Sequence, residues 1–140
     1  MTKLAFNRQA KRDYEILETF EAGLVLTGAE TKAAKTGQLN LKGSYIRINQ
    51  NQEVMLVDSH IGLYKKAKIP NYNPKRDRKL LLHKKEIKSL IGKLKQKGLT
   101  LVPLNVYTKR GLIKLSFSVA RGKKKQTRGM ILSKKKQKEG

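Results

Sequence analysis

The strongest constraint on the fold is a strict alternation of apolar and polar residues near the C-terminal end. Every second position from 113 to 119 is apolar, as shown by Ile113, Leu115, Phe117 and Val119. The positions between them are polar, namely Lys114, Ser116 and Ser118. Because successive side chains of a β-strand point to opposite faces, this pattern predicts a strand with one buried and one exposed face.

Other short segments carry strand patterns of the same kind. Residues 14–20 and 45–48 alternate, whereas 24–26 and 54–57 are short apolar runs that are typical of buried strands. The polar connection at 50–52 suits a hairpin. In 99–106, the apolar residues change phase in the middle of the segment. One extra residue near Pro103 would restore consistent burial, so we predict a β-bulge there.

Two segments carry helix signals. Thr27 and Glu30 have the spacing of a capping box, which predicts a helix over about 28–36 that stops at Gly37. A second helix, over about 84–97, is predicted by four apolar residues at i, i+3, i+4 and i+7: Ile87, Leu90, Ile91 and Leu94. His83 and Glu86 resemble the N-cap of that helix and its partner at the third helical position.

These elements predict one mainly β domain with two or three helices. With five or six short strands in so small a chain, we expect a closed or nearly closed barrel of the oligonucleotide-binding (OB) type. We assign this barrel to residues 13–120, after a basic N-terminal arm at 1–12. Residues 65–76 lack an apolar period and predict a mobile loop. Residues 121–140 form a Lys-rich tail that we expect to be disordered when free.

The charge of the chain points to a polyanionic partner. Thirty-three Lys and Arg residues stand against ten Asp and Glu residues, for a net charge of +23. Repeated phosphates are the usual partner of such a protein. Half of the acidic residues nevertheless fall between positions 13 and 30: Asp13, Glu15, Glu18, Glu21 and Glu30. Either they contact exposed base edges of a nucleic acid, or they neutralise neighbouring Lys and Arg side chains.

Most catalytic chemistry is excluded by what the sequence lacks. It contains no Cys, and its two histidines, His60 and His83, are far apart in sequence. It has no phosphate-binding glycine loop, no dinucleotide fingerprint and no zinc-protease motif. We therefore expect no enzyme activity, no cofactor and no metal. The N-terminus has no apolar run, so we expect no signal peptide, no membrane contact and a cytoplasmic location.

Five blocks of sequence carry a family resemblance. They are YEILETFEAGLVLTGAETK at 14–32, NLKGSYIRI at 40–48, RKLLLHKKEI at 78–87, KGLTLVPL at 97–104 and ARGKK at 120–124. In this order and at this spacing, they resemble the small tmRNA-binding proteins, also called SsrA-binding proteins or the SmpB family. The resemblance runs from position 7 to position 124, which covers nearly the whole predicted domain.

The resemblance implies a non-catalytic RNA adaptor, acting as a monomer. Proteins of this family bind the tRNA-like domain of tmRNA and accompany it to ribosomes that have stalled on a message without a stop codon. The nascent chain is then tagged for proteolysis and the ribosome is released, in the process called trans-translation. The partners implied are tmRNA and the stalled ribosome, mainly the decoding centre and message channel of its small subunit. The basic tail is expected to enter that channel.

The resemblance also implies site residues, position by position. Glu21 matches an RNA-contacting acid, and Leu81, His83 and Lys114 match positions that support RNA binding or ribosome contact. Further RNA-binding positions lie in the matching blocks: Asn7, Arg8, Lys11, Glu30, Lys32, Asn40, Ser44 and Tyr45. Tyr45 could stack on a base or pack on the core. The positions expected to serve the tail and the ribosome are Arg121, Lys123, Lys124, Lys125 and Arg128.

The tail departs from the family pattern. An Asp-Lys-Arg element usually follows, but here the positions are Thr127-Arg128-Gly129. Because Gly costs about 1 kcal/mol relative to Ala inside a helix, helix formation across Gly129 is weakened.

Two alternatives to the adaptor are a structural ribosomal protein, which would share the charge and the tail, and an RNA-modifying or RNA-cleaving enzyme, for which the sequence offers no candidate residues.

Overall fold

Nine strands and three short helices make up the part of the chain that the structure describes. The structure is a computed structural model that describes residues 2–63 and 69–123. The predicted loop at 65–76 therefore lies partly outside the described residues, and the tail from 124 onward lies wholly outside them. The strands are β1 (Thr2–Phe6), β2 (Tyr14–Leu24), β3 (Leu39–Asn40), β4 (Tyr45–Ile48), β5 (Val54–Val57), β6 (His60–Ile61), β7 (Arg78–Leu81), β8 (Leu99–Lys109) and β9 (Leu112–Gly122). The helices are α1 (Ala10–Asp13), α2 (Gly28–Lys35) and α3 (Lys84–Leu94).

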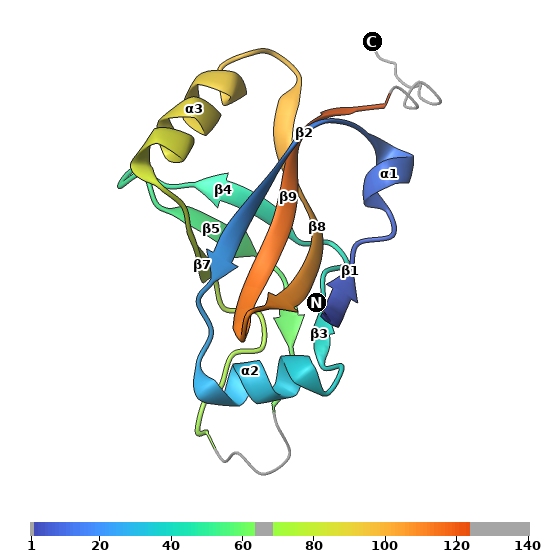
Figure 1. The fold of residues 1–140 in the computed structure, drawn as a ribbon, viewed down its shortest axis with the longest axis vertical. Coiled ribbons are helices and arrows are strands. Elements are labelled where there is room, and N and C mark those ends of the chain that lie inside the picture. Colours follow the sequence, from blue (N-terminus) through green and yellow to red (C-terminus); the bar gives the residue numbers. More distant parts are fainter. Residues whose placement is uncertain (1, 64–68, 124–140) are drawn as a thin grey trace.

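Seven of the strands form one antiparallel sheet in the order β1-β8-β9-β2-β7-β5-β4, and β3 pairs with β6. The mainly β class with helices is thus confirmed (Figure 1). The OB-like barrel is supported only in outline. The sheet curls until β4 approaches β8, but the edge strands β1 and β4 are not hydrogen-bonded to each other, so the sheet stays open. A closed barrel has no such edges.

The centre of the sheet is the long hairpin of β8 and β9. Its two strands join at Arg110 and Gly111, which both have positive φ values of 53° and 79°, as a two-residue hairpin turn requires. The register of the pair shifts between Pro103 and Asn105, which confirms the predicted bulge. The alternating residues of 113–119 are buried as predicted. Ser118 is a correction: it is buried as well, and its hydroxyl is satisfied by donating to the Glu18 carbonyl of the neighbouring strand β2 at 2.8 Å.

The helices begin as the sequence predicts. The Thr27 hydroxyl accepts a hydrogen bond from the Glu30 N–H at 3.1 Å, and the Glu30 carboxylate accepts one from the Thr27 N–H at 3.0 Å. Helix α3 starts after His83, whose backbone N–H donates to Glu86 at 3.0 Å. It ends at Leu94, three residues earlier than predicted, and the backbone continues to Gly98, where φ is +86°. Leu90 of α3 and Ala33 and Ala34 of α2 enter the main core.

Both ends of the described chain are built into the fold. Residues 2–6, predicted as part of an arm, form β1 and pair with β8. Ala10 of α1 packs against Val102 and Ala120 in a small second cluster on the sheet. At the other end, β9 continues to Gly122 opposite Tyr14.

Val25 is a second correction: it is 42% exposed, because β2 ends at Leu24 and the next side chain turns outward.

Candidate nucleic-acid interface

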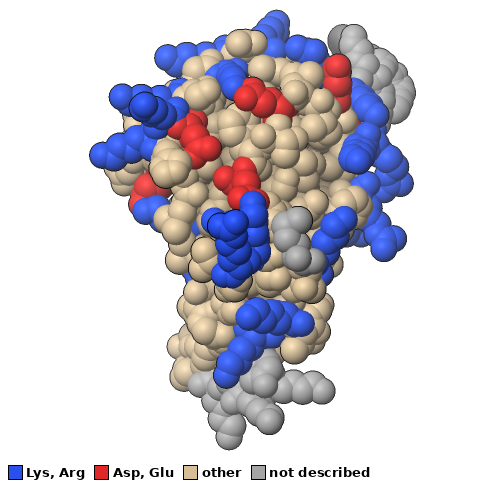
Figure 2. Space-filling model, viewed as in Figure 1, with Lys and Arg blue, Asp and Glu red and all other residues tan. Residues whose placement is uncertain are grey.

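The charges are unevenly placed on the surface. Figure 2 shows Lys and Arg side chains along the margins of one face and in groups nearer its middle, with fewer Asp and Glu side chains scattered among them and among uncharged residues. Each acid that the sequence placed in β2 meets a cation from a distant element. Glu15 lies 3.5 Å from Arg121, and Glu18 bonds to Lys93 of α3. These acids of the 13–30 group therefore neutralise Lys and Arg side chains, which is one of the two interpretations of their clustering in the sequence.

One hollow brings together residues from three separate segments of the sequence, within 6–14, 40–45 and 100–103. A pocket of about 300 Å³ is lined by Phe6, Asn7, Arg8, Gln9, Arg12, Asn40 and Lys42. An adjoining pocket of about 290 Å³ shares Asn7 and Gln9 and adds, among others, Ser44 and Tyr45. We call the two together the N-terminal groove. It contains five of the predicted RNA-binding residues, namely Asn7, Arg8, Asn40, Ser44 and Tyr45.

Three of those five residues shape the groove through their own hydrogen bonds. The Asn7 side-chain amide donates to the Pro103 carbonyl at 2.8 Å, which ties the segment to the bulge of β8. The Asn40 side-chain oxygen, Oδ1, accepts from the Lys42 N–H at 2.8 Å, and the Ser44 hydroxyl donates to the Leu41 carbonyl at 2.6 Å. Such contacts fix turns. The side chains that these turns present to solvent include Arg8, Lys42 and Tyr45.

Tyr45 belongs to the surface. Its side chain is 45% exposed, whereas the next residue of β4, Ile46, is buried in the core. The sequence left open whether Tyr45 stacks on a base or packs on the core, and the alternation of β4 decides against the core.

A second hollow assembles four predicted residues on the outer face of the sheet. A pocket of about 440 Å³ is lined by Glu21, Gly23, Leu81, Leu82, His83, Glu86 and Lys114, and we call it the outer-sheet pocket. Gly23 of β2 pairs with Lys114 of β9 on one side and with Leu81 of β7 on the other. A Cβ at Gly23 would lie 3.4 Å from the Leu81 Cβ, so the absence of a side chain keeps the floor of the pocket low.

Glu21 is held in place from β8. Its carboxylate accepts a hydrogen bond from the Tyr107 hydroxyl, and the Lys109 ammonium lies 3.4 Å from both of its oxygens. The Tyr107 hydrogen bond is the largest cause that lowers the pKa of Glu21; burial opposes it, and Lys109 and Lys114 add to it. Burial and Glu21 raise the pKa of Tyr107 to about 12. Near neutral pH, Glu21 is therefore a carboxylate with lone pairs left for a further donor.

Leu81 and His83 form the rim of the same pocket. The Leu81 side chain is 56% exposed, although its neighbour Leu80 is buried in the core. The His83 backbone is committed to Glu86, while its side chain is exposed. The exposed Leu81 side chain can pack on the face of a base or a sugar. The neighbouring Glu21 carboxylate and Lys114 ammonium can bond to the polar edge of the same group.

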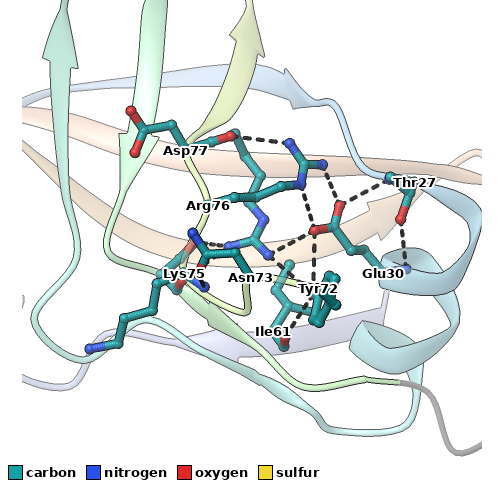
Figure 3. A network of polar contacts seen from close by, with 10 residues as sticks. Thr27, Glu30, Ile61, Tyr72, Asn73, Lys75, Arg76 and Asp77 are labelled. Carbon is teal, nitrogen blue, oxygen red and sulfur yellow. Dashed lines mark hydrogen bonds and ion pairs between the residues drawn. The ribbon is translucent and has the colours of Figure 1, made fainter. Parts of the chain in front are cut away.

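Glu30 is a correction to the predicted interface, because its side chain is inaccessible. The residue is 1% exposed and sits in the network of Figure 3. Its carboxylate accepts from Arg76 Nε at 2.8 Å and from Arg78 Nη2 at 2.8 Å. Burial alone raises the pKa of Glu30, but the hydrogen bonds from Arg76, Thr27 and Arg78 outweigh it and lower the pKa to about 2. Glu30 is a structural anion.

The network anchors part of the segment predicted as a mobile loop. The Tyr72 hydroxyl donates to the Ile61 carbonyl at 2.7 Å, and the Arg78 guanidinium reaches the Ser59 carbonyl at 3.0 Å. Arg76 also donates to the Asp77 carbonyl at 3.1 Å. Residues 72–78 are thereby tied to helix α2 and to the chain around β6.

The remaining predicted residues that the structure describes lie outside the linings of both hollows. Lys11 and Lys32 are exposed on α1 and α2. The Lys123 ammonium donates to the Lys11 carbonyl at 2.7 Å, and the Lys123 N–H donates to the Asp13 carbonyl at 2.9 Å. Arg121 pairs with Glu15. Lys124, Lys125 and Arg128 lie outside the described residues.

Sequence reasoning missed several residues that complete the hollows. Gln9, Arg12 and Lys42 line the N-terminal groove, and Tyr107 and Lys109 hold Glu21. The first three are polar neighbours of predicted residues, which is a usable signal. The other two could be found only by pairing β8 with β9 and β2 with β9 in the correct register.

Within residues 2–63 and 69–123, three or more His, Cys, Asp or Glu side chains nowhere gather as metal ligands would. None of the helices among these residues is long and apolar enough to cross a membrane.

Comparisons with known proteins agree over most of the chain. The family model described as SmpB protein matches residues 4–140. An SsrA-binding protein of Thermosynechococcus vestitus is 54% identical over 123 residues, which are 86% of this chain and 80% of that protein. One of Caldicellulosiruptor saccharolyticus is 53% identical over 86% of this chain and 76% of its own. A solved chain described as "tmRNA-SmpB: a journey to the center of the bacterial ribosome" matches with a TM-score of 0.69 and 44% identity, over 96% of this chain and 88% of that one.

Proposed function

We propose, from the premise that this chain belongs to the SmpB family of SsrA-binding proteins, that it binds the tRNA-like domain of tmRNA and delivers it to stalled ribosomes for trans-translation. The observation that carries this function is sequence identity. Over 86% of its length, the chain is 54% and 53% identical to two proteins named for binding SsrA. The likeness to a chain solved with tmRNA on the ribosome supports the same partners. Sequencing the RNA that co-purifies with the protein tests the function directly.

The two hollows are the surfaces on which we place the RNA. The N-terminal groove offers Arg8, Arg12 and Lys42 to phosphates and Tyr45 to a base. The outer-sheet pocket offers Lys114 to a phosphate and Glu21 to base amino groups or ribose hydroxyls. Phosphate contacts orient an RNA, and contacts to bases and sugars select it. Glu30 is left out of this interface because it is buried.

We propose that the protein acts as a non-catalytic adaptor in the cytoplasm and works as a monomer. Each hollow contains basic and polar side chains of the kinds that bind RNA, which fits an adaptor. The body carries the recognition of tmRNA, and the tail from Lys124 onward serves the ribosome.

RNA binding should depend steeply on salt. Four phosphate contacts, from Arg8, Arg12, Lys42 and Lys114, would release counterions and give a slope of about −3 to −4 in a plot of log affinity against log salt. Arg12→Ala should reduce this slope by about one, and Lys35→Ala, which removes an exposed cation outside both hollows, should not. Titrations of the tRNA-like RNA between 50 and 300 mM salt, about the range in which such slopes are resolved, measure this. A flat affinity would contradict the electrostatic basis of the interface.

Glu21→Ala should weaken RNA binding although it makes the protein more positive. Simple electrostatics predicts tighter binding, whereas loss of a carboxylate that bonds to base or ribose groups costs about 1–3 kcal/mol of binding free energy. Glu15→Ala is the matched control, because it removes the same charge from β2 outside both hollows and should not weaken binding. If both variants bind with equal or improved affinity and intact circular dichroism, Glu21 only balances charge.

A further inference from the structure

Phe6 presents an aromatic ring to solvent at the wall of the N-terminal groove. It is 52% exposed, whereas Leu4 and Ala5 before it pack against the main core. The register of β1 on β8 shifts between Lys3 and Ala5, which breaks the simple alternation just before Phe6. An aromatic ring left in water gives up the stabilisation that burial would provide, so packing does not explain the exposed position of Phe6.

The surroundings of the ring are cationic. Arg8, Arg12 and Lys42 line the same pocket, and the Lys3 ammonium lies 5.8 Å from the ring centroid. None of the described residues that line this pocket is acidic, and the adjoining pocket of the groove adds one acid, Asp13. An exposed aromatic ring among basic side chains is the combination with which proteins hold single-stranded nucleic acid, because the ring stacks on a base while the cations hold its phosphates.

The ring is also held on a fixed support. Phe6 is paired with Asn105 of β8, and the next residue, Asn7, donates its backbone N–H to the Leu104 carbonyl at 2.8 Å. The Asn7 side chain adds its bond to Pro103. The backbone on which the ring stands is therefore set by the sheet before any ligand arrives, which reduces the entropy lost on binding.

We propose that Phe6 is a stacking residue for one unpaired nucleobase of the bound RNA, with the flanking phosphates held by Arg8, Arg12 and Lys42. This inference rests on the proposed function and adds a base-contacting residue to the N-terminal groove. The base must come from a loop, a bulge or an end of the RNA, because a base within a duplex has no free face.

Substitutions at Phe6 test the stacking. Phe6→Ala and Phe6→Leu should both weaken the affinity for the transcribed tRNA-like domain by about 5- to 150-fold, the range seen when one base–aromatic stack is lost, and Phe6→Trp should retain it. Phe6→Leu keeps the apolar bulk but not the π face, which separates stacking from simple apolar contact. Leu17→Ala is the matched control, because Leu17 is 42% exposed, apolar and outside both hollows, and it should bind like the unmodified protein.

Fluorescence provides an independent readout. The chain contains no Trp, so Phe6→Trp and Leu17→Trp each carry a single indole. Adding the tRNA-like RNA should quench the emission of Phe6→Trp and leave that of Leu17→Trp unchanged. The inference is overturned if Phe6→Leu binds like the unmodified protein or if the indole at position 6 is not quenched while binding occurs. If the unmodified protein itself fails to bind this RNA, the proposed function falls, and the inference falls with it.

Discussion

Glu30→Gln is expected to lower the free energy of unfolding by about 3–5 kcal/mol, which is a large part of the total stability of an ordinary domain. The change keeps the size of the side chain but removes the negative charge that faces Arg76 and Arg78. Arg78 is fully buried, so its guanidinium would lose its counter-ion in a place that water does not reach. Urea unfolding followed by circular dichroism measures the loss.

Glu53→Gln is the control for this prediction. Glu53 lies 3.4 Å from Lys79, with both side chains well exposed, and such surface pairs are worth at most about 1 kcal/mol. Equal losses in the two variants would contradict the special weight given to the buried network.

Acid unfolding adds a second signature of Glu30. Its pKa is about 2 in the folded protein and 4.5 ordinarily, so the folded state favours the ionised form. The resulting stability is present above pH 4.5 and is lost as the pH falls from about 4.5 towards about 2. The difference in stability between the unmodified protein and Glu30→Gln should therefore shrink over that window.

Removal of the tail after Lys123 is expected to abolish tagging on stalled ribosomes while binding to the tRNA-like RNA persists. The cut follows Lys123 because this residue is still hydrogen-bonded to the folded body, through the carbonyls of Lys11 and Asp13. All the residues that line the two hollows are then retained. A reconstituted translation reaction on a message without a stop codon, scored for tagged product, measures the effect.

A tail of the same composition in shuffled order is the control for charge. It should restore whatever general electrostatic attraction to RNA the truncation removes, because counterion release depends on the number of phosphate contacts. If the truncated protein still supports tagging, the tail only adds charge, and the changed stretch Thr127-Arg128-Gly129 marks a lost function.

Local signals predicted the elements of the fold well, and long-range pairing was beyond them. The capping box at Thr27 and the helical spacing of Ile87, Leu90, Ile91 and Leu94 depend on residues within two turns of each other. The phase change at Pro103 is equally local. Whether the sheet closes depends on the lengths and registers of strands far apart in sequence, and no local pattern encodes those.

The sequence predicted individual residues of the site better than it predicted which of them lie together. The family resemblance supplied Asn7, Arg8 and Asn40 as separate positions, and the fold brings them to one groove. It also supplied Glu30, which in the sequence stands only as the capping-box partner of Thr27. Its burial arises from Arg76 and Arg78, which follow it by 46 and 48 residues and which no local pattern connects to it.

The sheet order has a consequence for the synthesis of this protein. Strand β1 pairs with β8 and β2 pairs with β9, so Thr2 finds Thr108, 106 residues later in the chain. Pairings of such high contact order form late and slowly. During translation, β1 and most of β2 stay unpaired at their edges until the last hairpin has left the exit tunnel. A product cut short by a broken message would lack that hairpin and expose those edges to aggregation. This protein would itself then be a substrate for the rescue that it is proposed to serve.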